Sequence, residues 1–322
     1  MKRIALVIGA TGGIGGETAR ALLASGWTVR ALSRNAERAQ QDAPQIEWRQ
    51  GDAMNAAEVV AAAAGVSVVV HAANPPGYKN WRGLALPMLE SSIAAAKSAG
   101  ARIVLPGTVY NFGPDAPELI DEAAPQHPLT RKGKIRVEME ERLREASRQG
   151  TPVLIVRAGD FFGPRAKNNW FSQGLVKPGR PLRSVTYPGD HDASHAFAFL
   201  PDLAATIVRL LERAADLQAF EVFHFAGHDF ERGVELAQAT RRAAGVPDAP
   251  IRRFPWFAIY LLSPVIETFR EMLEMRYLWQ RSLRLDNRKL RAFLGAEPHT
   301  PLEQALRLTL EELRCTSTPR PS

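Results

Sequence analysis

Cysteine is almost missing from this sequence: the 322 residues contain a single one, Cys315. One thiol cannot form an intramolecular disulfide, which suits a reducing compartment such as the cytoplasm. Long apolar runs are missing too, because no segment approaches the ~18 residues of a membrane-spanning helix. The longest candidate, from Trp256 to Ile266, is interrupted by Pro264. We therefore expect a cytoplasmic protein without a membrane span, stabilised by a large apolar core.

Positive charge is in excess, but it is not gathered in one place. The formal net charge is +7, from 41 Lys and Arg against 34 Asp and Glu. Arginines alternate with glutamates in segments such as 137–149, and no aromatic-interleaved basic stripe, helix-turn-helix pattern or zinc knuckle occurs. This distribution argues against a nucleic acid partner. Solvated helix faces and an anionic small-molecule substrate explain it better.

Strand-like and helix-like segments alternate over the first 160 residues. Apolar runs rich in Val, Ile and Ala are followed by amphipathic segments that end at glycines such as Gly26 and Gly100. The alternation predicts an α/β fold with a doubly wound parallel sheet of the Rossmann type, because parallel strands need crossover helices on both faces. The predicted strands are 3–9, 28–34, 46–52, 66–74, 101–107 and 152–160, with a late strand at 220–227 that returns to the sheet.

The remaining segments lack this alternation and predict a smaller, mostly helical C-terminal substrate lobe. The sequence thus divides into a dinucleotide-binding domain, a lobe and a flexible tail. The first is 1–163, completed by about 196–228; the lobe is 164–195 and 229–313; and the tail is 314–322. The aromatic segment 252–280 has two readings, a core of the lobe or a surface that faces lipid or a partner.

Three glycines follow the first predicted strand at a spacing of three residues, and a helix-like segment comes directly after them. Glycine permits a tight turn there, lets backbone amides approach a pyrophosphate, and lets the helix pack against the strand. The start of that helix adds partial positive charge for the phosphates. The predicted phosphate-binding residues are Gly9, Ala10, Thr11, Gly12, Gly13, Ile14 and Gly15.

The end of the second predicted strand bears on the choice of cofactor. Proteins that bind NAD often have a carboxylate there, but this chain has Ser33 and Arg34. A guanidinium can pair with the 2′-phosphate of NADP and stack on adenine. We therefore expect NADP, with NAD as the alternative. Arg34 could also be a solvated residue at a strand end.

Together with the glycine turn, later segments resemble the extended short-chain dehydrogenase/reductase family, which includes NAD(P)-dependent epimerases and dehydratases. "GDAMN" follows the third predicted strand, "HAAN" the fourth and "RAGDFFGP" the sixth, and segments 199–211 and 294–313 resemble later landmarks of the family. The resemblance covers nearly the whole chain. It implies contacts with the cofactor from Arg34, Asp52, Ala53, Ala72, Ala73, Asn74, Lys134, Ala158, Gly159, Asp160 and Phe161.

The catalytic pattern of that family is altered in this chain. The family has Tyr and then Lys four residues later, with Ser or Thr after strand five; the Lys binds the nicotinamide ribose and lowers the pKa of the Tyr. Lys134 matches the Lys, and Glu138 follows at the usual spacing, but Thr130 stands where the Tyr is expected. A threonine hydroxyl is a far weaker acid than a phenol. The candidate catalytic residues are Lys134, Thr108, Tyr110 and Thr130.

Two hypotheses for the function follow. The first is an enzyme that transfers a hydride at a carbonyl or carbinol of a small substrate, with a non-standard proton donor such as Tyr110, Tyr78 or Tyr187. The second is a redox-inactive, NADP-binding regulatory or sensor protein. The basic stretch 131–134 is either part of the binding surface or a solvated helix edge. The cluster Asp190, His191, Asp192 and His195 is interpreted as a polar loop rather than a metal site. A homodimer is possible.

Overall fold

The computed structural model describes residues 3–75, 80–166 and 169–316. The chain divides into two compact units, which are described separately here. Unit 1 contains residues 1–111, 131–157 and 204–223. Unit 2 contains residues 112–130, 158–203 and 224–322. The segment 112–130, which no sequence feature set apart, is thus part of unit 2.

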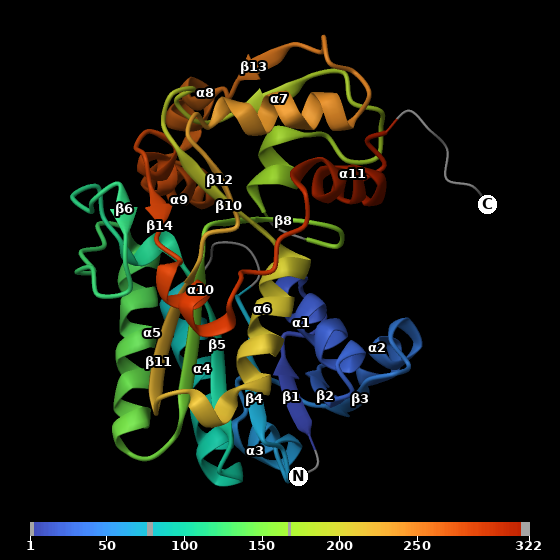
Figure 1. Ribbon diagram of the computed structural model, residues 1–322, viewed down its shortest axis with the longest axis vertical. Helices are drawn as coiled ribbons and strands as arrows, with labels where there is room; N and C mark the ends of the chain where they lie inside the picture. Colours follow the sequence, from blue (N-terminus) through green and yellow to red (C-terminus); the bar gives the residue numbers. More distant parts are fainter. Residues whose placement is uncertain (1–2, 76–79, 167–168, 317–322) are drawn as a thin grey trace. The chain divides into compact units, whose positions relative to one another are not determined.

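A seven-stranded sheet forms the centre of unit 1, with the strand order β11-β7-β5-β4-β1-β2-β3 (Figure 1). β1 pairs in parallel with both β2 and β4, so that Ala5 lies opposite Val29 on one side and Val68 on the other. The predicted parallel sheet and the late returning strand are confirmed. The strands are β1 Ile4–Ile8, β2 Thr28–Ser33, β3 Glu47–Gln50, β4 Val68–His71, β5 Arg102–Thr108, β7 Val153–Ala158 and β11 Phe220–Phe225.

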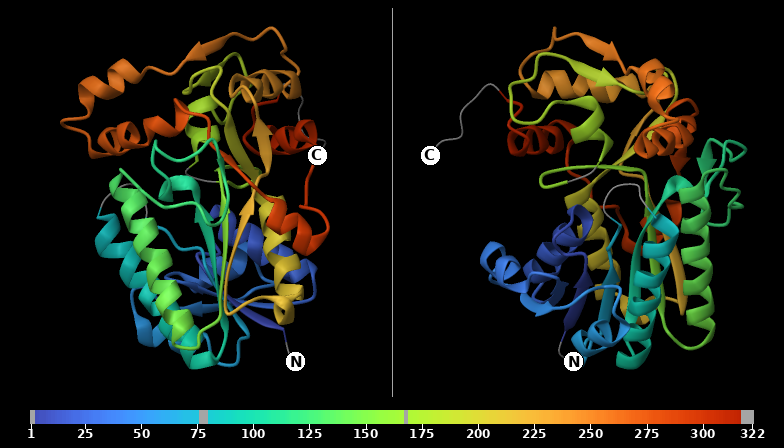
Figure 2. Two further views of the ribbon diagram at one scale, coloured as in Figure 1. Left: turned by 60° about the vertical axis from the view of Figure 1, so that its left-hand side comes forward. Right: turned by 180° about the vertical axis from the view of Figure 1, so that it is seen from behind.

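Helices cover both faces of this sheet, as a doubly wound fold requires. In Figures 1 and 2, α4 and α5 lie on one face, and α1 and α6 lie on the other. Two short helices, α2 and α3, were not predicted; each is only seven residues long and starts after an asparagine whose side chain caps it. The helices are α1 Gly13–Ala24, α2 Ala36–Asp42, α3 Ala56–Ala62, α4 Trp81–Ala99, α5 Arg131–Arg148 and α6 Leu200–Glu212.

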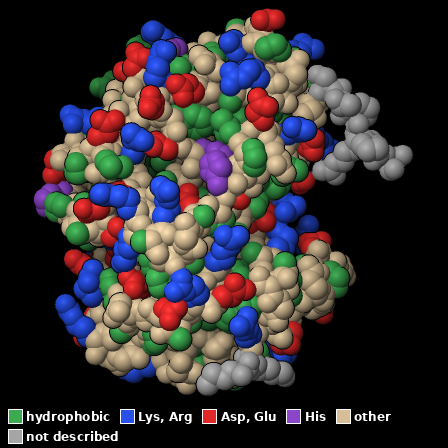
Figure 3. All heavy atoms as spheres, viewed as in Figure 1, with side chains coloured by type: hydrophobic (Ala, Val, Ile, Leu, Met, Phe, Trp, Pro, Cys, Tyr) green, Lys and Arg blue, Asp and Glu red, His purple; other side chains and the backbone are tan. Residues whose placement is uncertain are grey.

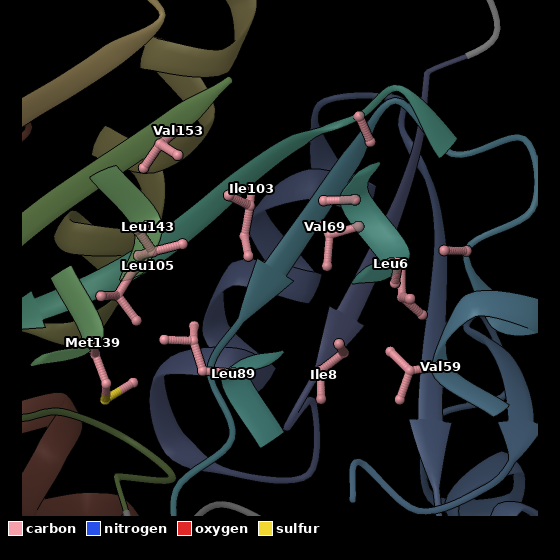
Figure 4. Packing of buried hydrophobic residues seen from close by; sticks show 14 of the residues in the cluster. Leu6, Ile8, Val59, Val69, Leu89, Ile103, Leu105, Met139, Leu143 and Val153 are labelled. Carbon is pink, nitrogen blue, oxygen red and sulfur yellow. The ribbon is translucent and has the colours of Figure 1, made fainter. Parts of the chain in front are cut away.

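The core of unit 1 lies between the sheet and helices α3, α4 and α5 (Figure 4). Leu6 and Ile8 point from β1 toward Val59 of α3 and Leu89 of α4. The intervening strand residues Ala5 and Val7 are buried on the opposite face of the sheet. Burial on both faces is the reason why these strands are continuous apolar runs rather than alternating ones.

Unit 2 contains helices, as predicted, and several short strands that the sequence did not reveal. A three-stranded sheet has the order β12-β10-β8, and two ribbons pair β13 with β9 and β14 with β6. Its strands are β6 Leu119–Ile120, β8 Asp160–Phe162, β9 Val185–Tyr187, β10 His195–Phe199, β12 His228–Phe230, β13 Ile251–Arg253 and β14 Arg284–Leu285. Its helices are α7 Val234–Ala243, α8 Trp256–Leu262, α9 Glu267–Glu274, α10 Arg288–Leu294 and α11 Leu302–Glu312. Short helical turns of unit 2 are η2 Phe171–Leu175 and η4 Met275–Trp279. Those of unit 1 are η1 Val109–Asn111 and η3 Ala214–Asp216.

The core of unit 2 is rich in aromatic side chains, with Phe162, Phe171, Phe197, Phe199 and Trp279 fully buried. Cys315 is buried as well, and its Sγ donates a hydrogen bond to the carbonyl of Lys177 (3.5 Å). Residue 315 lies in the segment that the sequence predicted to be a tail.

Lys and Arg side chains are interspersed with Asp and Glu side chains on the face drawn in Figure 3. This mixture agrees with the even spread of charge along the sequence. Among the residues that the structure describes, no helix is long and apolar enough to cross a membrane.

Candidate functional site

The glycine turn after β1 packs directly against the backbone of the segment that follows β4. Gly9 has φ +93°, and a Cβ atom on it would lie 2.6 Å from the carbonyl carbon of Ala72. A Cβ atom on Gly15 would collide with the carbonyl oxygen of Gly9, whereas the amide of Gly12 donates to that same oxygen (2.9 Å). Glycine is therefore required here both for the backbone conformation and for the close approach of Ala72 and Ala73.

The first turn of α1 has amide groups that no side chain caps. Gly12 has extended backbone angles and makes no side-chain cap, and the first turn contains no acidic residue. The free N–H groups and the helix dipole make this end of a twelve-residue helix suitable for an anion. Since β1 lies between β2 and β4, the turn stands at the switch point of the sheet, where such folds bind ligands.

The end of β2 is held in place by its neighbour β3, and Arg34 remains exposed. Gln50 donates to the carbonyl of Arg34 (2.6 Å), and Asn35 accepts the amide of Arg38 to start α2. Asp52 and Ala53 follow β3 at the same edge; the carboxylate of Asp52 accepts the amide of Met54 (3.0 Å). The structure thus brings the predicted residues Gly9 to Gly15, Arg34, Asp52, Ala53, Ala72, Ala73 and Asn74 to the carboxyl edge of adjacent strands.

Helix α5 buries a row of charged side chains, of which the sequence interpretation singled out only Lys132, within the basic stretch 131–134. Lys132, Arg136 and Glu140 are each at most 7% exposed, and they are separated by four residues, which places them on one helix face. Lys134 is exposed and Glu138 is half-buried. Thr130, Lys134 and Glu138 have the same spacing of four residues. Lys132, Arg136 and Glu140 each lie two residues later in the chain, on the inner face of the helix. We call these three residues the α5 inner face.

The α5 inner face is connected to three strand ends. Arg157 at the end of β7 pairs with Glu140 through two hydrogen bonds (2.7 and 3.0 Å), and the Asn111 amide donates to the same carboxylate (2.9 Å). Arg136 donates to Asn74 Oδ1 after β4 (2.8 Å), and its Nε has no partner among the described residues.

Trp81 of α4 contacts both cations of the α5 inner face. Lys132 Nζ lies 5.1 Å and Arg136 Cζ 5.2 Å from the centre of its ring. Burial lowers the pKa of the Arg136 guanidinium, and the negative charges of Tyr110 and Glu140 oppose that shift. Two buried cations on one aromatic ring make this a strongly positive environment.

The two candidate residues after β5 are close to each other. Thr108 ends the strand and is buried, and its Oγ1 accepts the amide of Tyr110 (2.9 Å). Tyr110 is half-buried, and the negative charge of its ionised form would raise the pKa of Arg136. Thr130 is buried and precedes α5 directly, in a segment of unit 2. Tyr78 lies outside the described residues.

In unit 2, the segment 158–161 is packed tightly into the small sheet. A Cβ atom on Gly159 would collide with the backbone of Ala196, which explains the glycine. The Asp160 carboxyl contacts Nε2 of His195 (2.9 Å), and Nδ1 of His195 contacts the carbonyl of Leu278 (3.0 Å). A carbonyl oxygen can only accept a hydrogen bond, so Nδ1 of His195 must carry a hydrogen. The contact between Nε2 and the Asp160 carboxyl then needs a second proton, which lies between these two groups. The carboxyl of Asp160 is therefore already engaged, and a cofactor contact from this segment would have to use its other atoms.

The polar loop before β10 does not assemble a cluster of ligands. Asp190 accepts the amide of Asp192, whose carboxylate pairs with Arg232 (2.9 Å), and His195 faces Asp160 instead. Within the described part of the chain, no group of three or more His, Cys, Asp or Glu side chains could hold a metal ion. Tyr187 is buried, and burial followed by the charges of Asp160 and Asp190 raises the pKa of its phenol.

One sequence pattern could have indicated that the charged row on α5 is buried. Ile135, Met139 and Leu143 mark the buried side of the helix, and Lys132, Arg136 and Glu140 are adjacent to them on a helical projection. Position by position, however, charged residues are expected to face solvent. Their burial becomes understandable from partners in distant segments, among them Arg157 and Asn111 for Glu140, Asn74 for Arg136 and Trp81 for both cations.

Known structures with the same fold cover almost the whole chain. UDP-glucose 4-epimerase from Bifidobacterium longum, in complex with NAD+ and UDP, is 18% identical with a TM-score of 0.75, over 97% of this chain and 98% of that one. UDP-glucuronic acid 4-epimerase from Bacillus cereus, in complex with NAD, is 16% identical with a TM-score of 0.74 over the same shares. The enzyme WbmH from Bordetella bronchiseptica, in complex with NAD+, is 21% identical with a TM-score of 0.70, again over 97% and 98%.

No curated protein sequence matches this chain. The sequence model of one family, described as the NAD dependent epimerase/dehydratase family, matches residues 5–226. The match includes the glycine turn, the segment after β4 and helix α5. This chain belongs to the NAD dependent epimerase/dehydratase family.

Proposed function

We propose that unit 1 binds NADP(H) and that the protein catalyses hydride transfer at a carbonyl or carbinol carbon of a small substrate. The observation that supports this best is the glycine turn, closed by Ala72 and Ala73 beside an uncapped helix start. When bound, the nicotinamide supplies the hydride donor or acceptor. Its proposed binding residues in unit 1 are Gly9 to Gly15, Arg34, Asp52, Ala53, Ala72, Ala73, Asn74 and Lys134.

The preference for NADP over NAD rests on the end of β2. Arg34 is exposed there, its carbonyl is fixed by Gln50, and the two adjacent residues Ser33 and Asn35 carry no charge. A planar guanidinium can bind a 2′-phosphate with two hydrogen bonds. The compared structures hold NAD, so NAD is the alternative cofactor that direct binding must test.

The proposed proton donor is Tyr110. It is the only tyrosine among the described residues of unit 1, and its ionised form would interact favourably with Arg136 and raise the pKa of that guanidinium. A guanidinium stabilises negative charge on a nearby phenol oxygen, which a proton donor needs after it has released its proton. The hydroxyl of Thr130 has no comparable acidity. Thr108 is proposed to hold the substrate oxygen, since its Oγ1 is already fixed beside Tyr110 by the amide of that residue.

Binding and turnover of the purified protein test this function. NADPH and NADH are titrated by fluorescence, and turnover is then screened with carbonyl compounds and nucleotide sugars. Nucleotide sugars come first because two of the compared structures are UDP-sugar 4-epimerases.

The matched variants are Tyr110→Phe and Thr130→Val. Tyr110→Phe should lower kcat about 100-fold or more, the order of a lost general acid, with an unchanged Kd for NADPH. Thr130→Val should keep most of the activity and lose about 1 kcal/mol of stability if its hydroxyl caps α5. An inactive but folded Thr130→Val protein, beside an active Tyr110→Phe protein, would contradict the assignment.

A redox-inactive NADP-binding sensor is the second candidate. It is favoured by one observation: Thr130 and Lys132, which lie four positions before Lys134 and Arg136, are not tyrosines. Tight binding of NADPH without turnover of any substrate class would support the sensor, whereas absence of NADPH and NADH binding would contradict both functions.

A further inference from the structure

Most of the exposed large apolar side chains of this protein are concentrated at one place in unit 2. Phe257 is 80% exposed, Leu261 64% and Val265 83%. Together with three neighbours they form a continuous stretch at and after helix α8. We call these residues the α8 tip: Phe257, Tyr260, Leu261, Leu262, Val265 and Ile266.

The α8 tip is an apolar helix face that points to solvent. Phe257, Tyr260 and Leu261 have the spacing of one helix face, and Ile259 is the only residue of α8 that is buried. A helix on the surface of a protein normally has the opposite arrangement, with its apolar face toward the core. Large exposed apolar patches mark sites of interaction.

The base of α8 is fixed, so its exposed face belongs to an ordered element. Trp256 donates from its indole nitrogen to the carbonyl of Pro188 (2.7 Å), and Arg276 lies 5.3 Å from the centre of the Trp256 ring. The hydroxyl of Ser263 donates to the carbonyl of Tyr260 (2.8 Å) at the end of the helix. In the left view of Figure 2, the orange helical hairpin of α8 and α9 extends away from the other elements of unit 2.

A basic hollow lies at the other end of the ribbon that leads to α8. It has a volume of about 400 Å³ and is lined by four exposed cations: Lys177, Arg180, Arg183 and Arg252. Among the residues that the structure describes, none of these four side chains is in an ion pair or a hydrogen bond. The hollow is therefore suited to anionic groups from outside the chain.

The basic hollow and the α8 tip are joined by the short ribbon β9–β13. Arg183 precedes β9 by two residues, Arg252 is within β13, and α8 begins three residues after β13 ends. The ribbon is three residues long, about 7 Å from its first Cα to its last. The short ribbon thus connects the cationic hollow of unit 2 to its apolar α8 tip.

We propose that the α8 tip and the basic hollow dock this protein onto the surface of an anionic lipid bilayer. Apolar side chains enter the boundary between headgroups and acyl chains, and Lys and Arg side chains bind the lipid phosphates and carboxylates. Tyr260 suits the same boundary, because its ring is apolar and its hydroxyl is polar. A second copy of this chain fits less well: it would bring an identical hollow of four unpaired cations toward the first.

Co-flotation with lipid vesicles tests the docking surface. The full-length protein is mixed with vesicles of phosphatidylcholine alone, or of phosphatidylcholine with about a third phosphatidylserine. We expect at least about tenfold more protein on the vesicles with phosphatidylserine, and loss of most binding when the salt is raised from about 0.05 to about 0.5 M. Two double variants, F257S/Y260S and R180Q/R183Q, should each reduce binding about tenfold or more.

Matched controls carry the same changes at exposed sites elsewhere. L308S removes an exposed leucine from α11, and R209Q/R307Q removes two exposed cations from α6 and α11; neither should change binding. The binding of NADPH should be unchanged in all variants, so docking and cofactor binding fail independently.

Four results would overturn the proposal. These are no binding to any vesicle, equal binding to neutral and anionic vesicles, unchanged binding of F257S/Y260S, or a stable dimer in solution that F257S/Y260S dissociates. Unchanged binding of F257S/Y260S together with competition by inorganic phosphate would identify the hollow as a site for free anions.

Discussion

His71 shows how the position of one side chain determines its protonation state. Ser92 donates its hydroxyl to the carbonyl of Met88 (3.0 Å), so its oxygen must accept the hydrogen of His71 Nδ1 (2.7 Å). Nε2 is then the unprotonated nitrogen, and it has no partner among the described residues. Burial, and then the positive charge of Arg136, lower the pKa of His71 to about 3. The imidazole is therefore neutral at the end of β4, beside the predicted cofactor residues.

Arg34 is the residue at which the preference for a cofactor can be tested directly. Arg34→Ala should weaken NADP(H) by about 1.5–3 kcal/mol, the order of a hydrogen bond to a charged group, and leave NAD(H) nearly unchanged. Calorimetric titration of both cofactors measures the difference. Arg38→Ala, which removes another exposed arginine from the adjacent helix, is the matched control. Equal weakening of both cofactors, or of neither, would refute a contact with the 2′-phosphate.

Two cations of helix α5 are alternatives for binding the cofactor. The sequence predicts Lys134, which is exposed, whereas Arg136 has the same spacing to Glu140 on the α5 inner face and binds Asn74. Solvent screens the interaction between a buried cation and the cofactor less than that of an exposed cation. We therefore expect Arg136→Met to raise the Kd for NADPH about tenfold or more. Lys134→Met should have a smaller effect.

Control measurements distinguish a loss of cofactor affinity from a loss of the folded structure. Circular dichroism and the urea midpoint verify that each variant is folded, and Arg136→Lys, which keeps the charge, should recover part of the affinity. If Lys134→Met is the variant that loses the cofactor while Arg136→Met retains it, the register predicted from the sequence is right and the α5 inner face has only a structural role.

Each unit of the whole molecule contains a histidine that is buried in its neutral form. In unit 2, burial and then the charge of His299 lower the pKa of His228 to about 4. Both histidines have folded pKa values below the value of about 6.5 in an unfolded chain. The unfolded chain therefore binds more protons at mildly acidic pH, so stability is complete above pH 7 and is lost as the pH falls below about 6.5.

Acid sensitivity should thus appear well before most carboxylates titrate. Between pH 7 and about pH 5.5, each of the two histidines should lower the free energy of unfolding by about 1 kcal/mol. Urea unfolding at a series of pH values measures this. His71→Gln should remove its share of the pH dependence. A wild-type stability that is flat over this range would show that neither histidine is buried in its neutral form.

The parallel sheet, the glycine turn and the family could all be predicted from the order of residues in the chain. These depend on residues that are neighbours in the chain: apolar runs of strand length, and glycines such as Gly9 and Gly15 whose spacing requires a tight turn. The alternation of strands and helices then leaves few possible topologies. Periodicity along the chain is a local property, and so it can be read without the fold.

The burial of individual side chains on α5 and α8 could not be predicted in this way and depends on the folded arrangement. Glu140 is inside because Arg157, from a strand that follows it in the chain, neutralises its charge, and Phe257 is outside because no segment that the structure describes covers it. From the sequence alone, a charged helix residue is expected in solvent and an aromatic residue in the core. Burial depends on contacts between distant segments, which the order of residues along one helix does not contain.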